Sequence, residues 1–401
     1  MKRIFYISAI LVACALGGSI SAQTWSQKQA MPGGIRDGAM SFSIGSKVYF
    51  GAGGGYKDFY EYDPATSKWT KKANIPGVTN ERAFCTGFCI GNKGYVGFGY
   101  DGNTNIKNDL WEYDPASDKW TRKTDFPGTH RDGVTCFVIG SNAYIGGGSD
   151  NQYLFGDFYE YNPAADTWTR KADLPTGPII FQATFNIGQF GYTVGGGGSV
   201  DESAETWRYD PVKDEWAQMS DFPATPRQCA VGFALNGLGY TGFGQSGYAT
   251  VYNDFYSYNP ATNTWAAAGT FPEARGRAWA TAAVADGRAY MGSGWDLAST
   301  FSRDWWEMNL TVAGIDNAVA GVNALNIYPN PVSDIVNIQI SDINGSGRVS
   351  LIDALGREII SRGITGRASL ETLDVSGLAS GVYLVKVESG YSSTIAKLVK
   401  R

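Results

Sequence analysis

Histidine is nearly absent from this chain of 401 residues, because His130 is the only one. A single histidine cannot form a multi-histidine metal site, and it leaves no spare member for a Ser-His-Asp or Cys-His catalytic arrangement. Cysteine is scarce as well, and none of the five cysteines has the spacing of a zinc site. The sequence therefore predicts no metal site and no cofactor.

The cysteines that follow the N-terminal segment leave two alternatives open. Cys85 and Cys89 lie four residues apart on one predicted strand, so both thiols share a face but are too distant for a disulfide with each other. One of them could bridge to Cys136, which occupies the equivalent strand of the next repeat. The other alternative is that these thiols and Cys229 are free and buried.

Long hydrophobic runs are also lacking. The one apolar stretch, Ile4–Leu16, follows a basic N-terminus, is too short to span a bilayer, and precedes small residues that end at Ala22. We therefore predict a signal peptide over residues 1–22. Leu11–Cys14 also fits a bacterial lipoprotein box, which would instead leave an acylated Cys14. No later segment is apolar over the roughly 18 residues that a span needs, so no transmembrane segment is predicted.

Charge of either sign is sparse, with 33 Lys and Arg against 38 Asp and Glu. This balance gives no general attraction to nucleic acid or to an anionic membrane, and we predict no nucleic-acid partner. Glycine is abundant at 52 residues, and aromatic residues make up 14% of the chain. Such a composition is typical of an all-β protein with tight turns and large buried rings.

What the chain has in abundance is an internal repeat. The phrase DFYEYDPATSKWTKKANIP begins at Asp58, and close copies begin at Asp109 and Asp157. One tryptophan of each copy recurs 44 to 51 residues after the last, at Trp25, Trp69, Trp120, Trp168, Trp216 and Trp265. A period near 50 residues made of short strands is typical of a β-propeller.

Each repeat is predicted to form four strands. The first opens with arginine, the second is rich in aromatics and glycine, and an Asp-Pro or Asn-Pro turn joins the third to the tryptophan strand. The first copy consists of its last strand only, with Trp25, and the last copy stops after its third strand, near Asn309. We therefore predict an all-β fold in which residues 23–312 form a six-bladed β-propeller whose last blade is closed by the N-terminal strand.

The glycine run, the nearby tyrosine and the late tryptophan of each copy resemble kelch repeats, from residue 24 to about 312. Galactose oxidase shares kelch-type blades, but its copper site needs two histidines, so this chain cannot assemble it. A bacterial sialic-acid epimerase is also a six-bladed kelch propeller, and its chemistry could run on the arginines and carboxylates that this chain has. No constellation of residues singles out that activity.

The tail is a second module. After a linker over residues 313–323, short alternating strands and Gly/Asn turns over residues 324–401 indicate a small β-sandwich. It resembles the C-terminal sorting domain of the bacterial type IX secretion system. The matching residues are Tyr328, Pro329, Asn330, Pro331, Asp353, Gly356, Arg357, Leu378, Gly381, Tyr383, Val385, Lys397, Leu398, Val399 and Lys400. The resemblance implies export by the type IX machinery, to the outer cell surface or the extracellular space.

One position at the start of the first strand carries arginine in five of the six blades. Innermost strands converge on the axis, so we expect these residues to ring one mouth of the channel, where guanidinium groups suit carboxylate, sulfate or phosphate. In the kelch adaptor of the oxidative-stress response, arginines at this position bind an acidic peptide, so the resemblance implies an acidic glycan or protein ligand. The residues are Arg36, Arg82, Arg131, Arg227 and Arg277, with Ile179 in the fourth blade.

The alternative for these arginines is structural. Each could brace its neighbour by pairing with Asp37, Asp132 or a carboxylate of the next blade. The acids that begin the third strand of every blade, by contrast, are expected to make a structural hydrogen bond, because catalysis needs one site rather than six. They are Asp58, Asp109, Asp157, Glu205, Asp254 and Asp304.

Two further features of the loops have open interpretations. Asp101–Asn105 has the alternating oxygen ligands of a calcium loop but lacks the downstream glutamate, which favours an ordinary glycine-rich loop. Aromatic loop residues could stack on sugar rings or simply pack into the core. These aromatics are Tyr100, Tyr153, Tyr248 and Trp295.

The leading hypothesis is a non-catalytic, exported propeller that binds a partner protein or an acidic glycan through its axial face. The alternative is an enzyme acting on acidic sugars, similar to N-acetylneuraminate epimerase, with one carboxylate of raised pKa in the axial pocket. Glu81 and Glu273 are the candidates for that carboxylate. A purely structural surface protein is the third reading.

Overall fold

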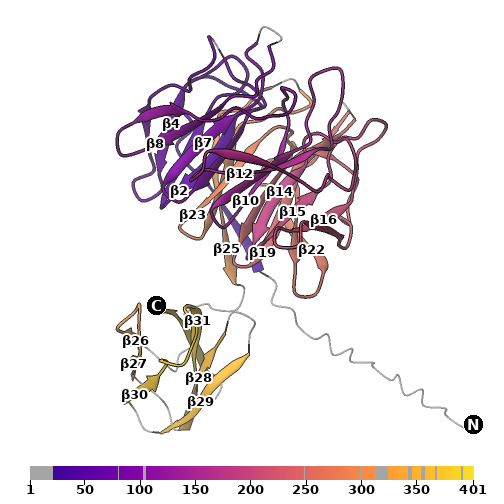
Figure 1. Cartoon of the computed structure of the whole chain (residues 1–401). Coiled ribbons are helices and arrows are strands. Elements are labelled where there is room, and N and C mark those ends of the chain that lie inside the picture. The colour runs from indigo at the N-terminus through magenta and orange to yellow at the C-terminus, as the bar shows by residue number, and fades with distance from the viewer. Residues whose placement is uncertain are drawn as a thin grey trace, which may run out of the picture. The chain divides into compact units, whose positions relative to one another are not determined.

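The structure, a computed structural model, describes residues 21–79, 81–102, 105–247, 249–298, 300–312, 324–341, 346–353, 357–365, 368–389 and 392–401. Every regular element in these ranges is a β-strand, and among them no helix is long and apolar enough to cross a membrane. The chain forms two compact units, Ser21–Thr311 and a C-terminal unit that begins at Val312 (Figure 1). The predicted signal peptide lies almost wholly outside the described residues.

Six antiparallel sheets build the first unit, and each is one blade. Five of them follow the chain in order from the inner to the outer strand. Blade one contains β2 (Met40–Ile44), β3 (Lys47–Gly51), β4 (Phe59–Asp63) and β5 (Lys68–Lys72), and blade two contains β6 (Thr86–Ile90), β7 (Lys93–Gly97), β8 (Leu110–Asp114) and β9 (Lys119–Arg122). Blade three contains β10 (Thr135–Ile139), β11 (Asn142–Gly146), β12 (Phe158–Asn162) and β13 (Thr167–Lys171), and blade four contains β14 (Ala183–Ile187), β15 (Phe190–Val194), β16 (Thr206–Asp210) and β17 (Glu215–Gln218). Blade five contains β18 (Gln228–Leu235), β19 (Leu238–Ser246), β20 (Thr250–Val251), β21 (Asp254–Asn259) and β22 (Thr264–Thr270).

Blade six, the last, is shared between the two ends of the unit. Its inner strands are β23 (Thr281–Ala285), β24 (Arg288–Gly292) and β25 (Trp305–Val312), and β1 (Ser21–Gln27) pairs with β25 as the outermost strand. Figure 1 shows the indigo start of the chain beside β25. The predicted propeller, with its last blade closed by the N-terminal strand, is confirmed. The predicted cleavage after Ala22 falls within β1 and stays a prediction.

A closed circuit of backbone hydrogen bonds joins the blades around the axis. It is made by the residue two positions after the arginine site of each blade, and each N–H donates to the carbonyl of the preceding blade's residue at 3.0 to 3.2 Å. All six residues have φ between 51° and 60°, in the left-handed region that favours glycine. We call these residues the axial ring: Gly38, Phe84, Gly133, Phe181, Cys229 and Trp279.

The tryptophan strands fasten neighbouring blades at the outside. Trp120 Nε1 donates to the carbonyl of Ala73 in the preceding blade at 2.9 Å, and Asp118 accepts the N–H of Ala73 at 2.9 Å and the hydroxyl of Tyr113 at 2.7 Å. Trp69, Trp168, Trp216 and Trp265 make the equivalent indole bond in their blades. The recurring tryptophan thus joins one blade to the next.

The C-terminal unit is a β-sandwich. One sheet contains β26 (Ala324–Tyr328), β27 (Ile335–Ser341) and β30 (Ala368–Asp374), and the other contains β28 (Ser346–Ile352), β29 (Glu358–Thr365), β31 (Gly381–Ser389) and β32 (Ser392–Lys400). Buried aliphatic residues of both sheets, such as Val336, Ile338, Leu351 and Val385, form one core.

The predicted sorting residues meet at one edge of this unit. Asn330 donates to the carbonyl of Lys397 at 2.7 Å and accepts the N–H of Val399 at 2.9 Å, which ties the Tyr328–Pro331 segment to the last strand. Val332 adds a parallel bridge to Lys400. Gly356 lies outside the described residues.

Candidate functional site

The five arginines are buried under the loops of their own blades. Arg82 is 0% exposed; it donates to both carboxylate oxygens of Asp109 at 2.8 and 2.7 Å and to the carbonyl of Phe98 at 2.9 Å. The equivalent ion pairs are Arg36–Asp58, Arg131–Asp157, Arg227–Asp254 and Arg277–Asp304, and no arginine of the set is more than 5% exposed. These residues do not form an accessible anion-binding ring; they brace their blades, with the third-strand acid as partner rather than Asp37 or Asp132.

Ring stacking and electrostatics reinforce each brace. The Arg131 guanidinium lies 4.7 Å from the ring centroid of Phe126 and 4.2 Å from that of Phe155. Burial by itself would raise the pKa of Asp304, but hydrogen bonds and the charge of Arg277 hold that pKa below its ordinary value. Asp304 therefore stays ionised as the structural counter-ion of Arg277.

The fourth blade replaces the brace with neutral groups. Ile179 is buried at the arginine position, and the Gln182 side chain donates to the carbonyl of Gly195 at 3.2 Å. That carbonyl lies 16 residues after the arginine position, as do the carbonyls that the five arginines bind. Gln182 therefore performs one half of the missing brace, while Glu205 accepts the indole N–H of Trp207 at 2.9 Å.

The accessible surface on the axis is aromatic. Blades two, four and six place Phe84, Phe181 and Trp279 on the axial ring, whereas the alternate blades carry Gly38, Gly133 and Cys229. The three aromatic rings meet pairwise, with centroids 5.5 Å apart for Phe84–Phe181, 5.9 Å for Phe84–Trp279 and 6.4 Å for Phe181–Trp279. We call them the aromatic triad, and they line a hollow of about 130 Å³ to which all six blades contribute.

A second tier of side chains surrounds the triad. Tyr100 stacks on Phe84 at 5.9 Å and an interplanar angle of 20°, and Trp295 lies 5.7 Å from Trp279. Tyr100 and Trp295 occupy equivalent positions in their blades. Each forms an antiparallel backbone bridge with the residue that follows the buried arginine, Tyr100 with Ala83 and Trp295 with Ala278. Two of the loop aromatics that the sequence singled out thus extend the triad rather than fill the core.

Carboxylates lie beside this aromatic surface. Burial raises the pKa of Asp132 to about 6, and burial together with the charge of Glu81 raises the pKa of Asp37. The pKa of Tyr100 is raised by its burial and then by the charges of Glu81, Asp37 and Asp132. The charges of all three carboxylates therefore act on Tyr100, which stacks on Phe84 of the triad.

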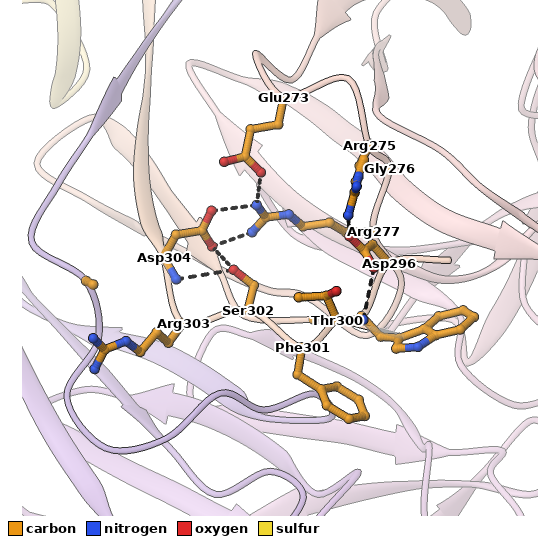
Figure 2. Close-up of a pocket in the computed structure, with 13 residues that line it drawn as sticks. Glu273, Arg275, Gly276, Arg277, Asp296, Thr300, Phe301, Ser302, Arg303 and Asp304 are labelled. Carbon is orange, nitrogen blue, oxygen red and sulfur yellow. Dashed lines mark hydrogen bonds and ion pairs between the residues drawn. The ribbon is translucent and has the colours of Figure 1, made fainter. Parts of the chain in front are cut away.

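A larger cavity of about 390 Å³ lies in the loops of the sixth blade (Figure 2). Glu273 and Asp304 both bind Arg277, each at 2.5 Å, and Asp296 binds Arg275 at 3.1 Å. Figure 2 shows these pairs facing one another, with Phe301 at the edge of the group. Three arginines and three carboxylates line the cavity, counting Arg303, so it has no net charge to attract an ionic ligand.

The remaining predicted features have structural roles or are unplaced. Asp101 pairs with Lys107 at 2.8 Å, and within the described ranges no group of three or more His, Cys, Asp or Glu could hold a metal. Glu81 accepts the N–H of Gly55, Tyr153 is 67% exposed, and Tyr248 lies outside the described residues. Cys85, Cys89, Cys136 and Cys229 are free, as one of the two alternatives predicted, but only Cys229 is fully buried and the other three are partly exposed.

Sequence reasoning missed the aromatic triad. Its signal was present, because the residue two positions after the arginine site reads Gly, Phe, Gly, Phe, Cys, Trp around the ring. Glycine at this position in two of the repeats suits the left-handed backbone, whereas the local backbone gives no reason for a bulky aromatic there. Aromatic residues at the same position in other repeats therefore indicate a role for the side chain.

Comparison with known proteins supports the two-part organisation. Residues 326–401 match the family described as the secretion system C-terminal sorting domain. This domain indicates export by type IX secretion to the cell surface or extracellular space.

The propeller is similar to sugar epimerases over part of its length. It is 32% identical to N-acetylneuraminate epimerase of Pasteurella multocida over 30% of this chain and 33% of that protein. It is 34% identical to N-acetylneuraminate epimerase 1 of Escherichia coli O6:H1 over 31% of this chain and 32% of that protein. The chain thus spans about a third of the length of these relatives. The solved structure of YjhT matches with a TM-score of 0.61 and 15% identity, covering 69% of this chain and 95% of that one, which shows a shared fold.

Proposed function

We propose that this chain is an exported propeller that binds a saccharide against the aromatic triad on its axial face. The observation that carries the proposal is the meeting of Phe84, Phe181 and Trp279 on the axis, with ring centroids 5.5 to 6.4 Å apart. Their φ of 51°, 56° and 54° costs a bulky residue roughly 1–3 kcal/mol of backbone strain. Blades one and three avoid it with Gly38 and Gly133.

The chemistry of the site favours a sugar ring. Aromatic faces suit the apolar side of a pyranose, and the neighbouring polar groups suit its hydroxyls. The hollow of about 130 Å³ is on the scale of one ring, much smaller than a protein interface. An anionic ligand held by the five predicted arginines is not supported, because each of those guanidinium groups already has an internal carboxylate.

The test is a glycan array probed with the full chain, followed by titration of the best saccharide. Phe84→Gly and Phe181→Gly each remove one ring at a backbone position that glycine tolerates. We expect each to weaken binding about tenfold or more, since a stacked ring contributes roughly 1–3 kcal/mol. Tyr153→Ala, which removes an exposed aromatic outside the triad, is the matched control and should bind normally. Failure to retain any saccharide, or unchanged affinity in both glycine variants, would defeat the proposal.

A second candidate function is epimerisation of an acidic sugar. Two observations favour it: the relatives named as N-acetylneuraminate epimerases, and Asp132, whose pKa of about 6 suits a general acid or base near neutral pH. Proton NMR of N-acetylneuraminate with the full chain would show faster anomer exchange, lost in Asp132→Asn. Exchange at the uncatalysed rate would reject this candidate.

A further inference from the structure

The axial mouth is negatively charged next to the aromatic triad. Asp37 and Asp132 follow the first and third arginine positions, and Glu81 precedes the second, so the three carboxylates border the blade that carries Phe84 and Tyr100. Asp132 is only 6% exposed and accepts a hydrogen bond from its own backbone N–H, and burial raises its pKa to about 6. A largely desolvated carboxylate whose only hydrogen-bond donor among the described residues is neutral gains from a ligand that brings a positive charge.

The neighbouring cations do not cancel this charge. Arg36, Arg82 and Arg131 are each neutralised by the third-strand acid of their own blade. Lys107 is paired with Asp101 at 2.8 Å. Lys57 keeps its charge, but its ammonium group donates to the carbonyl of Thr79 at 2.5 Å rather than to one of these carboxylates. The exposed His130 interacts with Asp150 rather than with these carboxylates.

We propose that the saccharide bound at the axial mouth carries a protonated amine, as an amino sugar does, with Asp37 and Asp132 as its counter-ions. This inference rests on the proposed function and adds the charge of the ligand. The faces of Phe84, Tyr100 and Trp279 attract a cation through their negative ring faces, and a partly desolvated carboxylate adds a direct ion pair. Aromatic rings and carboxylates together select a cation against a neutral or anionic analogue of the same shape.

The experiment compares three methyl glycosides that share one ring: those of glucosamine, N-acetylglucosamine and glucuronic acid. Each is titrated into the full chain near neutral pH by calorimetry. We expect glucosamine to bind about tenfold tighter than N-acetylglucosamine, with glucuronic acid weakest, and the preference to shrink as salt is raised. Asp37→Asn with Asp132→Asn should remove the preference, whereas Asp125→Asn, which changes an exposed acid of an outer strand connection, should not.

The outcomes separate the inference from the function on which it rests. Equal binding of glucosamine and N-acetylglucosamine, still sensitive to Phe84→Gly, would overturn the amine assignment and leave the saccharide site standing. Tightest binding of glucuronic acid would overturn it as well. Binding of none of the three sugars would count against both. A hexalysine peptide that competes as strongly as glucosamine would assign the mouth to a peptide and overturn the sugar part.

Discussion

Removing one buried arginine should destabilise the propeller far more than removing an exposed one. In Arg82→Met, the carboxylate of Asp109 loses two charge-assisted hydrogen bonds at 2.8 and 2.7 Å and keeps only the indole N–H of Trp111 at 2.7 Å. Asp109 is 7% exposed, so its charge remains buried without a counter-ion. Breaking such a pair costs about 3–5 kcal/mol in free energy of unfolding, which lowers the melting temperature of a unit this size by roughly 5–10 °C.

A double variant isolates the charge. Arg82→Met with Asp109→Asn keeps an acceptor for Trp111 but removes the unpaired charge, so we expect it to be more stable than Arg82→Met alone by about 1–3 kcal/mol. Arg122→Met is the control, because Arg122 pairs with Asp125 at the surface, with 58% of its side chain exposed. That change should cost less than about 1 kcal/mol.

The assay is urea unfolding of the full chain followed by tryptophan fluorescence. All 12 tryptophans lie between residues 25 and 306, so the signal reports the propeller and not the C-terminal sandwich. The reasoning would be refuted if Arg82→Met cost no more than Arg122→Met. It would also be refuted if the double variant were less stable than the single one, because the damage would then not arise from an uncompensated carboxylate.

Three further predictions concern other parts of the molecule. Asp118→Ala removes the acceptor shared by Tyr113 and the N–H of Ala73 in the preceding blade, and should cost about 1–3 kcal/mol in urea unfolding; no loss would contradict a role in joining blades. Asp132→Asn should stabilise the fold by up to about 3 kcal/mol at pH 7, because a pKa raised to about 6 means that the ionised carboxylate is disfavoured above that pH. That gain should shrink as pH falls through 6 and vanish only below about pH 4, where the carboxyl is protonated in both the folded and the unfolded protein; a gain independent of pH would contradict the assignment. Deleting residues 324–401 should leave the propeller in the periplasm of a host with type IX secretion, and fractionation that finds it outside the cell would count against the sorting role.

Repetition made the propeller predictable from the sequence. Equivalent residues recur at a fixed period, so each copy reports on the others, and the incomplete copies at Trp25 and Asn309 already indicate a blade shared by the two ends. The paired exceptions also carried information, because the blade with Ile179 in place of arginine is the one with Glu205 in place of aspartate. That coincidence signals that arginine and acid are partners within one blade.

The direction of those arginines was decided only by the tertiary structure. Alternation of inward and outward side chains holds within a regular strand, but Arg36 lies four residues before β2, in a loop where no period applies. In the folded ring, the arginine turns under its loop to meet the third-strand acid, and the left-handed residue two positions later faces the axis instead. The sequence therefore identified which positions form a ring. Only the tertiary structure determined that the accessible ring is aromatic rather than basic, because each buried arginine needs a carboxylate partner inside its own blade.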